Sequence, residues 1–212
     1  MVVMAATSLS ASVAKNLLAA YPAAVSAAEA RDARRKKGKL VSLDKWWRGE
    51  GRDAARERGH VTKEALIKLV TWKITRGKMR PLLGYARDMD ARALEAASKH
   101  AFVEGTTFDD AIKPLIALRG IGPATASAIL SWASDDWPFM SDEALLATGE
   151  RTYTLKRLEA LHASLGELAG KWGMSASDAE KVLYALANGD GDADGGAEGE
   201  TEGAPAKKKT RR

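Results

Sequence analysis

The chain has 212 residues, of which 45% are hydrophobic, and it carries a formal net charge of +5 at pH 7. Because it has no cysteine and only three histidines, disulfides, thiolate-bound zinc and cysteine-held iron–sulfur clusters are excluded, and we expect no structural metal and no cofactor. No apolar run reaches the roughly 18 residues that a membrane span needs, so we expect no membrane association.

Residues 1–30 are rich in alanine and serine and contain only Lys15 and Glu29 as charged residues. They lead directly into an arginine-rich stretch. This pattern is typical of an N-terminal amphipathic helix, and an organelle targeting segment has the same composition. The sequence alone leaves both interpretations open.

Residues 31–87 carry 18 lysines and arginines against 6 acidic residues, whereas residues 88–187 carry 9 against 15. A basic segment of this kind is typical of a polyanion-binding protein, because each neutralised phosphate releases condensed counterions. A solvated basic face without a partner has the same composition. Within the segment, glycines and charges flank Trp46 and Trp47, so an aromatic contact surface is the alternative to a place in the core.

The first clear helix begins after Thr62, an N-capping residue type, and ends near Gly77, with a proline beyond it. We expect Trp72 of this helix to lie in the core. Four cations crowd its C-terminal end and the following loop, where they complement the helix dipole and can bind a phosphate backbone. These cations are Lys73, Arg76, Lys78 and Arg80.

Helical periodicity continues to residue 187 without sustained apolar/polar alternation, which predicts an all-α, multi-helix domain over residues 31–187. Pro114 lies inside the helix expected from about Thr107 and should kink or split it. The other expected helices are Ala91–Phe102, Pro123–Ala133, Ser141–Thr148, Tyr153–Trp172 and Ser175–Ala187.

Residues 188–212 are rich in glycine and acidic residues and have almost no large apolar side chain. Such a segment cannot offset the entropy cost of ordering, so we expect a disordered tail that is acidic and then basic. The basic cluster at residues 207–212 is typical of a nuclear-localisation or nucleic-acid-contacting tail.

The most informative string is LRGIGPATASAIL at residues 118–130, which joins two predicted helices through a tight turn. Gly120 and Gly122 allow positive backbone torsions there, and Ile121 between them can enter the core. Pro123 suits the first position of the next helix. The free N–H groups and the dipole at the start of that helix form an anion site that a phosphate can approach closely.

This string resembles the helix-hairpin-helix motif of the DNA glycosylases related to endonuclease III and the adenine-mismatch glycosylases. The resemblance implies that the hairpin, including Ile121 and Ala124, contacts DNA, with Thr125 adding a hydroxyl. A glycine-bearing turn used for protein contacts is the alternative. The residues that carry the resemblance are Leu118, Gly120, Gly122, Thr125, Ala126, Ile129 and Leu130.

Members of that superfamily carry an essential aspartate about twenty residues after the hairpin, at the start of a helix, and Asp142 resembles it in position. A carboxylate there can stabilise an oxocarbenium-like sugar or activate water as the N-glycosidic bond of a flipped base breaks. The alternative is that Ser141 and Asp142 only cap the following helix.

The chain departs from the family pattern in three places. Ala124 stands where the bifunctional glycosylases have a lysine nucleophile, so the resemblance implies a monofunctional enzyme without Schiff-base strand cleavage. Residues 143–145 differ from the threonine, histidine and arginine pattern that usually follows the aspartate, and the four-cysteine cluster loop is absent. Residues 71–83 also resemble a stretch in a poorly characterised eukaryotic branch of hairpin-containing proteins.

The sequence therefore predicts a monomeric, all-α DNA-binding protein that resembles a monofunctional DNA glycosylase of base excision repair. Asp142 is its candidate catalytic residue. We expect it in the nucleus, with a mitochondrion or plastid as the alternative. A non-catalytic helix-hairpin-helix DNA-binding module and a helical protein-interaction domain are the two competing hypotheses, and the sequence leaves open whether the chain is an enzyme.

Overall fold

The structure is a computed structural model that describes residues 8–189. Within this range the chain forms helices and no strand, which confirms the all-α prediction. The expectations for residues 190–212, including the terminal basic cluster, lie outside the described residues. The helices are α2 (Ala11–Arg31), α3 (Ala33–Lys37), α4 (Leu40–Arg48), α5 (Glu50–Arg58), α6 (Lys63–Arg76), α7 (Leu83–Asp88), α8 (Ala91–Lys99), α9 (Phe108–Ile116), α10 (Pro123–Ala133), α11 (Asp142–Thr148), α12 (Leu155–Trp172) and α13 (Ala176–Asn188), with a 3-10 turn, η1 (His100–Phe102), after α8.

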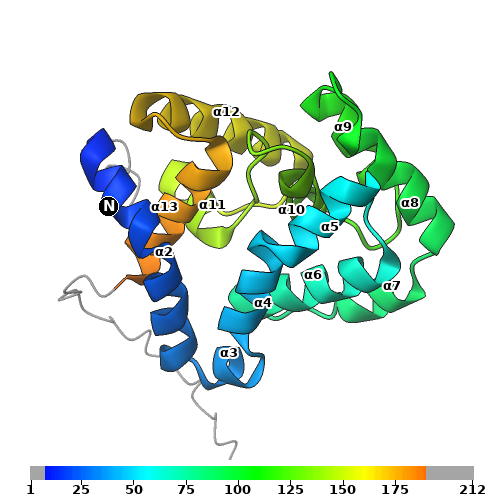
Figure 1. The fold of residues 1–212 in the computed structure, drawn as a ribbon, viewed down its shortest axis with the longest axis horizontal. Coiled ribbons are helices and arrows are strands. Elements are labelled where there is room, and N and C mark those ends of the chain that lie inside the picture. Colours follow the sequence, from blue (N-terminus) through cyan, green and yellow to red (C-terminus); the bar gives the residue numbers. More distant parts are fainter. Residues whose placement is uncertain (1–7, 190–212) are drawn as a thin grey trace, which may run out of the picture.

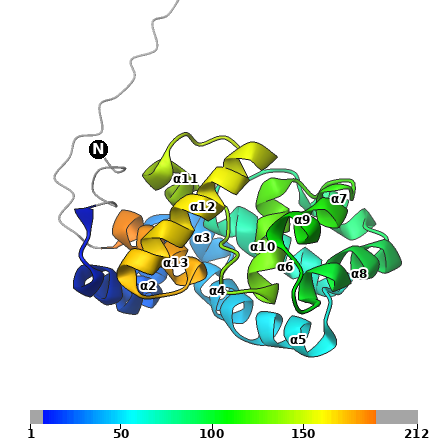
Figure 2. The same ribbon diagram turned by 90° about the horizontal axis from the view of Figure 1, so that it is seen from above.

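Helices α6 and α10 lie in the middle of the molecule. Figures 1 and 2 show α2, α12 and α13 on one side of them and α7, α8 and α9 on the other. Every residue of α10 from Ala124 to Trp132 is buried, because neighbouring helices cover all of its faces. The start of this buried helix is therefore held rigidly where the two sides of the molecule meet.

Helix α2 packs most extensively on α13, so the first and last described helices lie together (Figure 1). Its buried face is made of small residues and one tyrosine, whose hydroxyl donates a hydrogen bond of 2.8 Å to Asp44. This part of the alanine-rich N-terminal segment is thus a helix of the folded domain. The buried residues of α2 are Ala14, Tyr21, Ala24, Val25 and Ala28.

Most helix boundaries follow the local signals in the sequence. The Thr62 hydroxyl accepts a hydrogen bond from the amide of Ala65 at 3.2 Å, and α10 covers the predicted range. Helix α9 is not split into two pieces, one of the two predicted outcomes, because it is one element with Pro114 inside it. The helix ends only two residues later, at Ile116, so the missing N–H removes one bond near its end without dividing it.

The two adjacent tryptophans lie in or against the core and do not form the contact surface considered from the sequence. The Trp47 ring is 5% exposed and stacks on Trp72, which is fully buried, with ring centroids 3.9 Å apart. The Trp46 ring packs edge-on against Trp132. The flanking glycines had favoured a surface position for these rings. Gly51 is instead needed for packing, because a Cβ on Gly51 would lie 2.8 Å from the Trp46 ring.

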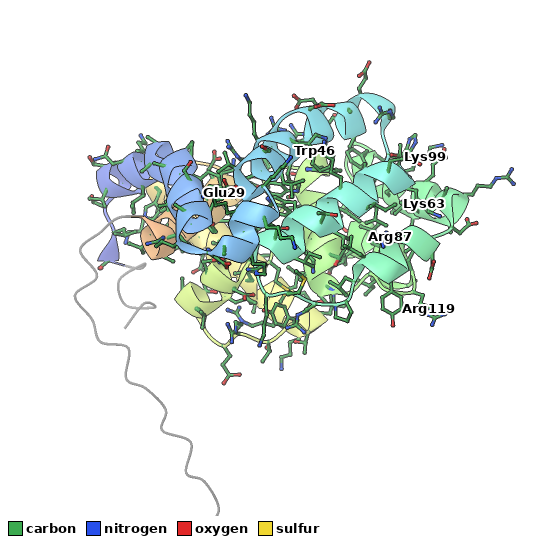
Figure 3. The ribbon with its side chains drawn as sticks, turned by 90° about the horizontal axis from the view of Figure 1, so that it is seen from below. Glu29, Trp46, Lys63, Arg87, Lys99 and Arg119 are labelled. Carbon is green, nitrogen blue, oxygen red and sulfur yellow. The ribbon has the colours of Figure 1, made fainter. Side chains whose placement is uncertain are left out.

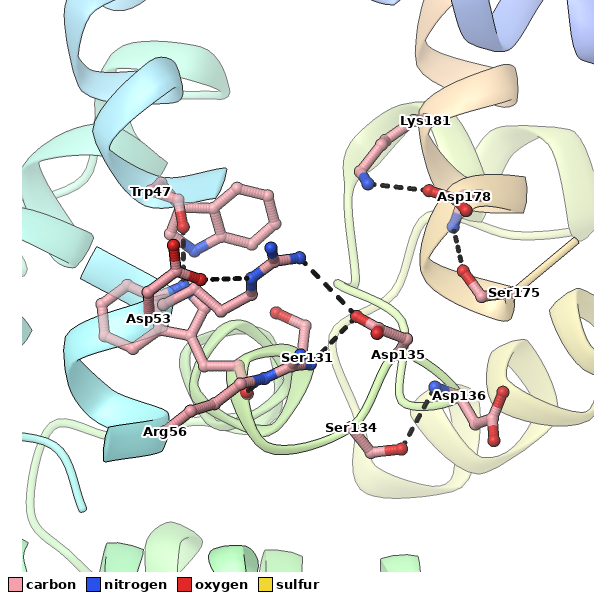
Figure 4. A network of polar contacts seen from close by, with 12 residues as sticks. Trp47, Asp53, Arg56, Ser131, Ser134, Asp135, Asp136, Ser175, Asp178 and Lys181 are labelled. Atoms are coloured by element: carbon pink, nitrogen blue, oxygen red, sulfur yellow. Dashed lines mark hydrogen bonds and ion pairs between the residues drawn. The ribbon is translucent and has the colours of Figure 1, made fainter. Parts of the chain in front are cut away.

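Many cations of the basic segment 31–87 have partners inside the protein. Arg34 donates hydrogen bonds to three backbone carbonyls at the C-terminal end of α6, where a cation complements the helix dipole. Arg52 and Arg56 of α5 both pair with Asp135, in the loop after α10 (Figure 4). The segment is therefore not one free cationic face, and the cations that remain available must be identified individually.

Candidate nucleic-acid interface

The turn between α9 and α10 contains two glycines in different conformations. Gly120 has a φ of +90°, and a Cβ there would lie 2.3 Å from the Cβ of Tyr85, so this position requires glycine. Gly122 has a φ of −93°, and a Cβ there would contact nothing within 4 Å. The predicted positive torsion therefore holds for Gly120 alone. Gly122, the N-cap of α10, instead leaves open space over the helix start.

Some backbone amides of this turn donate a hydrogen bond within the protein, and others have no acceptor among the described residues. Ile121 donates its N–H to the carbonyl of Leu118 at 3.0 Å, and Thr125 donates to the carbonyl of Gly122 at 2.9 Å. The amides of Gly122 and Ala124 have no acceptor among residues 8–189. Ile121 departs from its expected DNA contact, because its side chain is 4% exposed and its amide is already bonded.

A pocket open to solvent lies over the start of α10 and has a cavity volume of about 170 Å³. Two of the predicted cations, Lys73 and Arg80, reach it from the end of α6 and the loop that follows. Thr125 lines it too, although this residue is 3% exposed. The fold thus brings together two sequence segments that were predicted separately. The lining residues are Lys73, Arg80, Leu82, Gly120, Gly122, Pro123, Ala124, Thr125 and Tyr153.

A second, smaller pocket, with a cavity volume of about 40 Å³, adjoins the first and is lined by Asp142. The residues common to both pockets are Lys73, Arg80, Leu82, Ala124 and Tyr153. The remaining lining residues of the second pocket are Ile74, Arg76, Gly77, Lys78, Phe139, Met140, Ser141, Asp142 and Glu143. The hairpin and the predicted catalytic carboxylate therefore open onto neighbouring hollows.

The cap and the pocket carboxylate at the start of α11 are different residues. The Ser141 hydroxyl accepts a hydrogen bond from the amide of Ala144 at 3.2 Å, and it is the N-cap. Asp142 accepts a hydrogen bond from the Tyr153 hydroxyl, and its Oδ2 lies 3.8 Å from Nη1 of Arg151. The Asp142 side chain is 23% exposed. Asp142 is thus engaged by side chains at the pocket and not by the amides of its own helix.

Tyr153 belongs to the site, although the sequence predicted it only as the start of a helix. Thr154 caps α12, which leaves Tyr153 in the preceding loop. The Arg80 guanidinium lies 4.9 Å from the centre of its ring. Burial, together with the hydrogen bond and charge of Asp142, raises the pKa of Tyr153, so the phenol keeps its proton and donates to the carboxylate. No local pattern in the sequence indicates this pairing across a loop.

A buried serine fixes the carboxylate segment to the hairpin helix. The Ser127 hydroxyl accepts a hydrogen bond from the amide of Met140 at 2.9 Å and lies 3.3 Å from the carbonyl of Ala124, to which it donates. Ser127 is fully buried. Because one hydroxyl joins the first turn of α10 to the chain just before Asp142, the two parts of the site keep a fixed spacing.

Arg76 departs from its predicted role as a phosphate contact. It is 1% exposed and pairs with Glu180 of α13 at 2.7 Å. Its guanidinium also lies 4.2 Å from the ring centre of Tyr184 and 5.2 Å from that of Phe139. Arg76 therefore lines the second pocket, but a phosphate group cannot reach its buried guanidinium. Lys78 and Arg80, in contrast, are exposed.

Lys73 lines both pockets and is half-buried. Its amine has no hydrogen-bond or ion-pair partner within residues 8–189, in contrast to Arg76 one turn further along α6. Burial and the nearby charge of Arg80 lower the pKa of Lys73 to about 8, although Asp142 acts in the opposite direction. A part of the Lys73 population is therefore neutral near physiological pH.

Two further residues at the turn were not predicted as site residues. Arg119 is exposed (Figure 3), and its guanidinium lies 5.7 Å from the centre of the Tyr85 ring. Tyr85 is 43% exposed and packs against Gly120. Together they add a cation and an aromatic face to the surface beside the hairpin.

Across the part of the chain that the structure describes, no group of three or more histidine and acidic side chains could hold a metal ion. No helix in that part is long and apolar enough to cross a membrane. No protein-family model, curated protein or solved structure matches the chain. The residues of the two pockets are therefore the features of the chain that indicate a function.

Proposed function

We propose that the chain binds duplex DNA through the start of α10 and hydrolyses the N-glycosidic bond of a flipped, damaged or mismatched base. One observation carries the proposal: the free amides of the hairpin and the carboxylate of Asp142 line adjoining pockets that share Lys73 and Arg80. An anion site beside a carboxylate suits a nucleotide, because its phosphate and its sugar lie next to each other.

In this proposal the amides of Gly122 and Ala124 bind a backbone phosphate, with Arg80 adding a positive charge. The sugar then lies toward Asp142, whose carboxylate stabilises the positive charge that develops at C1′ as the base departs. Water adds to C1′, the C1′–N bond breaks, and the base leaves with a proton. Tyr153 orients the carboxylate through its hydrogen bond.

Asp142→Asn tests the catalytic part of the proposal. The amide keeps the size of the side chain but not its charge, so base release from a panel of damaged and mismatched duplexes should fall by about 10²-fold or more. Affinity for the duplexes, measured by fluorescence anisotropy, should stay largely unchanged. Asp109→Asn is the matched control, because Asp109 is an exposed carboxylate in the first turn of α9.

The outcomes separate the competing functions. Retention of base release by Asp142→Asn would contradict the catalytic assignment. Salt-dependent binding by the wild-type chain, without release of any base, would identify a non-catalytic DNA-binding module. Failure to bind duplexes at low salt would remove the DNA function and leave a helical protein-interaction domain.

A further inference from the structure

Helix α3 carries four consecutive basic residues, which form two different pairs. Arg34 and Arg35 are half-buried, and both form ion pairs with Asp32, at 3.2 and 3.5 Å. Lys36 and Lys37 are exposed, and their amines have no hydrogen-bond or ion-pair partner among the described residues. The arginines therefore hold the helix in place, whereas the lysines are free to bind a ligand.

Helix α3 is attached to the end of α6 that lines the second pocket. The Arg34 guanidinium donates hydrogen bonds to the carbonyls of Ile74 at 2.6 Å and Gly77 at 3.0 Å. Both acceptor residues line the second pocket. Gly38, directly after α3, packs closely on α6, because a Cβ there would lie 2.6 Å from Cγ2 of Thr75. Helix α3 is therefore a direct neighbour of the pocket that contains the candidate catalytic carboxylate.

Lys39 follows α3 and adds a third exposed cation to this region. Its side-chain amine also has no partner among the described residues. Its φ is +55°, and no other non-glycine residue in the described part of the chain has a positive φ. Such a conformation strains an L-residue, and strain of this kind is concentrated at positions that bind or act on a ligand. Because glycine would avoid this strain, the lysine indicates a use for its charge.

We infer that Lys36, Lys37 and Lys39 form a second phosphate-binding site for duplex DNA, separate from the start of α10. The inference rests on the proposed function, because the duplex must already lie across the two pockets. Lys78 and Arg80 are exposed in the loop between α6 and α7, which begins at the contact with α3. Exposed cations therefore extend from the pockets to α3.

The kind of partner follows from this extended arrangement of cations. A small phosphate ligand fills one site or the other, whereas a duplex, with a phosphate about every 3.4 Å along each strand, can occupy both at once. Lysine suits such contacts, because its ammonium is a point charge that does not require a fixed geometry. The second site would thus position the duplex without reading its sequence.

The double variant Lys36→Gln/Lys37→Gln tests the site in the full chain, with undamaged duplexes of several sequences. Its affinity at low salt should fall by about tenfold, to the same extent for each sequence. The slope of log K against log salt should become shallower by about two, roughly one for each lost phosphate contact. Titrations followed by fluorescence anisotropy over a range of salt concentrations give both values.

Lys15→Gln/Lys99→Gln is the matched control, because it removes the same charge from exposed lysines of α2 and α8. Figure 3 shows Lys99 on the opposite side of the molecule from Glu29, which lies shortly before α3. The control should change the affinity by less than about twofold. Thermal unfolding of both double variants checks that they are folded.

Lys39→Gly separates a binding role from a structural one. Glycine adopts a positive φ without strain, so the melting temperature should be unchanged or higher. The affinity for duplexes should nevertheless fall, because the charge is lost. A lower melting temperature with unchanged affinity would exclude Lys39 from the site.

A crosslink reports directly on whether DNA lies at α3. Because the chain has no cysteine, Lys37→Cys provides one thiol for a photoactivatable crosslinker. Irradiation in the presence of a duplex should give a protein–DNA adduct on a denaturing gel. The same crosslinker on Lys99→Cys should give none.

The failures of the two proposals are distinguishable. If the wild type binds duplexes and Lys36→Gln/Lys37→Gln keeps its affinity and salt slope, the second site is overturned and the proposed function is untouched. Equal losses in the control variant would mean that net charge alone matters, which also overturns the site. Failure of the wild type to bind duplexes would overturn both proposals. Losses confined to the α3 variant, without base release by the wild type from any lesion, would support the site and contradict the glycosylase step.

Discussion

The two helices of the hairpin begin in opposite ways. At the start of α9, the Thr107 hydroxyl accepts a hydrogen bond from the amide of Asp110 at 3.2 Å and donates one to the Asp110 carboxylate at 2.8 Å. At the start of α10, Gly122 has no side chain, and two nearby amides have no acceptor among the described residues. A side chain therefore caps the start of α9, whereas the start of α10 leaves amide donors without an acceptor that a ligand can bind.

The difference is one between stability and binding. A side-chain cap satisfies orphan amides and stabilises a helix by about 0.5–2 kcal/mol, but it also occupies the place where an anion would bind. Burial of α10 on all sides stabilises that helix independently of a cap. The fold can therefore leave the cap position of α10 empty, and substitutions at the two starts should separate the two effects.

The largest effect should come from Gly120→Ala, which changes the turn that presents the start of α10. A left-handed conformation costs a non-glycine residue about 1–2 kcal/mol, and the new Cβ would lie 2.3 Å from the Cβ of Tyr85. We expect the free energy of unfolding to fall by at least about 2 kcal/mol in urea titrations. Gly122→Ser, in open space nearby, should change it by less than about 0.5 kcal/mol. Equal losses in the two variants would contradict this account of the turn.

Gly122→Asp should make the start of α10 resemble that of α9. Its carboxylate can accept hydrogen bonds from the amides of the first turn, so stability should be unchanged or slightly higher, whereas DNA affinity should fall by about tenfold at low salt. Gly122→Asn caps without a charge and should show a smaller, less salt-dependent loss. Fluorescence anisotropy at several salt concentrations measures both. Wild-type affinity in Gly122→Asp would mean that DNA binds elsewhere.

Thr107→Ala should have the smallest effect, confined to α9. Loss of this cap should lower the free energy of unfolding by about 1 kcal/mol and leave DNA affinity unchanged. Thr107→Ser keeps the hydroxyl and serves as the control. A fall in affinity with Thr107→Ala would show that the two helix starts are coupled.

Most helices after residue 62 were predictable from the sequence because capping and periodicity are local, whereas α3, α4, α5 and α7 were not predicted as separate elements. Thr62, Gly122 and Pro123 mark boundaries through the bonds of their own turn, and the structure places those boundaries as predicted. Asp142 was expected beside the hairpin because of the family resemblance, and the two line adjoining pockets in the structure.

The parts that were missed depend on contacts between distant positions. Arg76 was predicted as a phosphate contact because Glu180, its partner 104 residues away, leaves no mark on the local pattern. The pairing of Tyr153 with Asp142 depends on the path of a loop, and the position of Lys73 beside Ala124 depends on how α6 packs near α10. Such arrangements follow from tertiary packing, which no short window of sequence contains.

The packing of α2 on α13 has a consequence for biosynthesis. Arg31 and its hydrogen-bond partner Asn188 are 157 residues apart, so at about 5–20 residues per second α2 is made roughly ten to thirty seconds before α13. During that interval the face that α13 will cover is exposed to solvent or to chaperones. Because that face is largely alanine, it exposes little large apolar surface to other nascent chains. We therefore expect little aggregation before α13 is made.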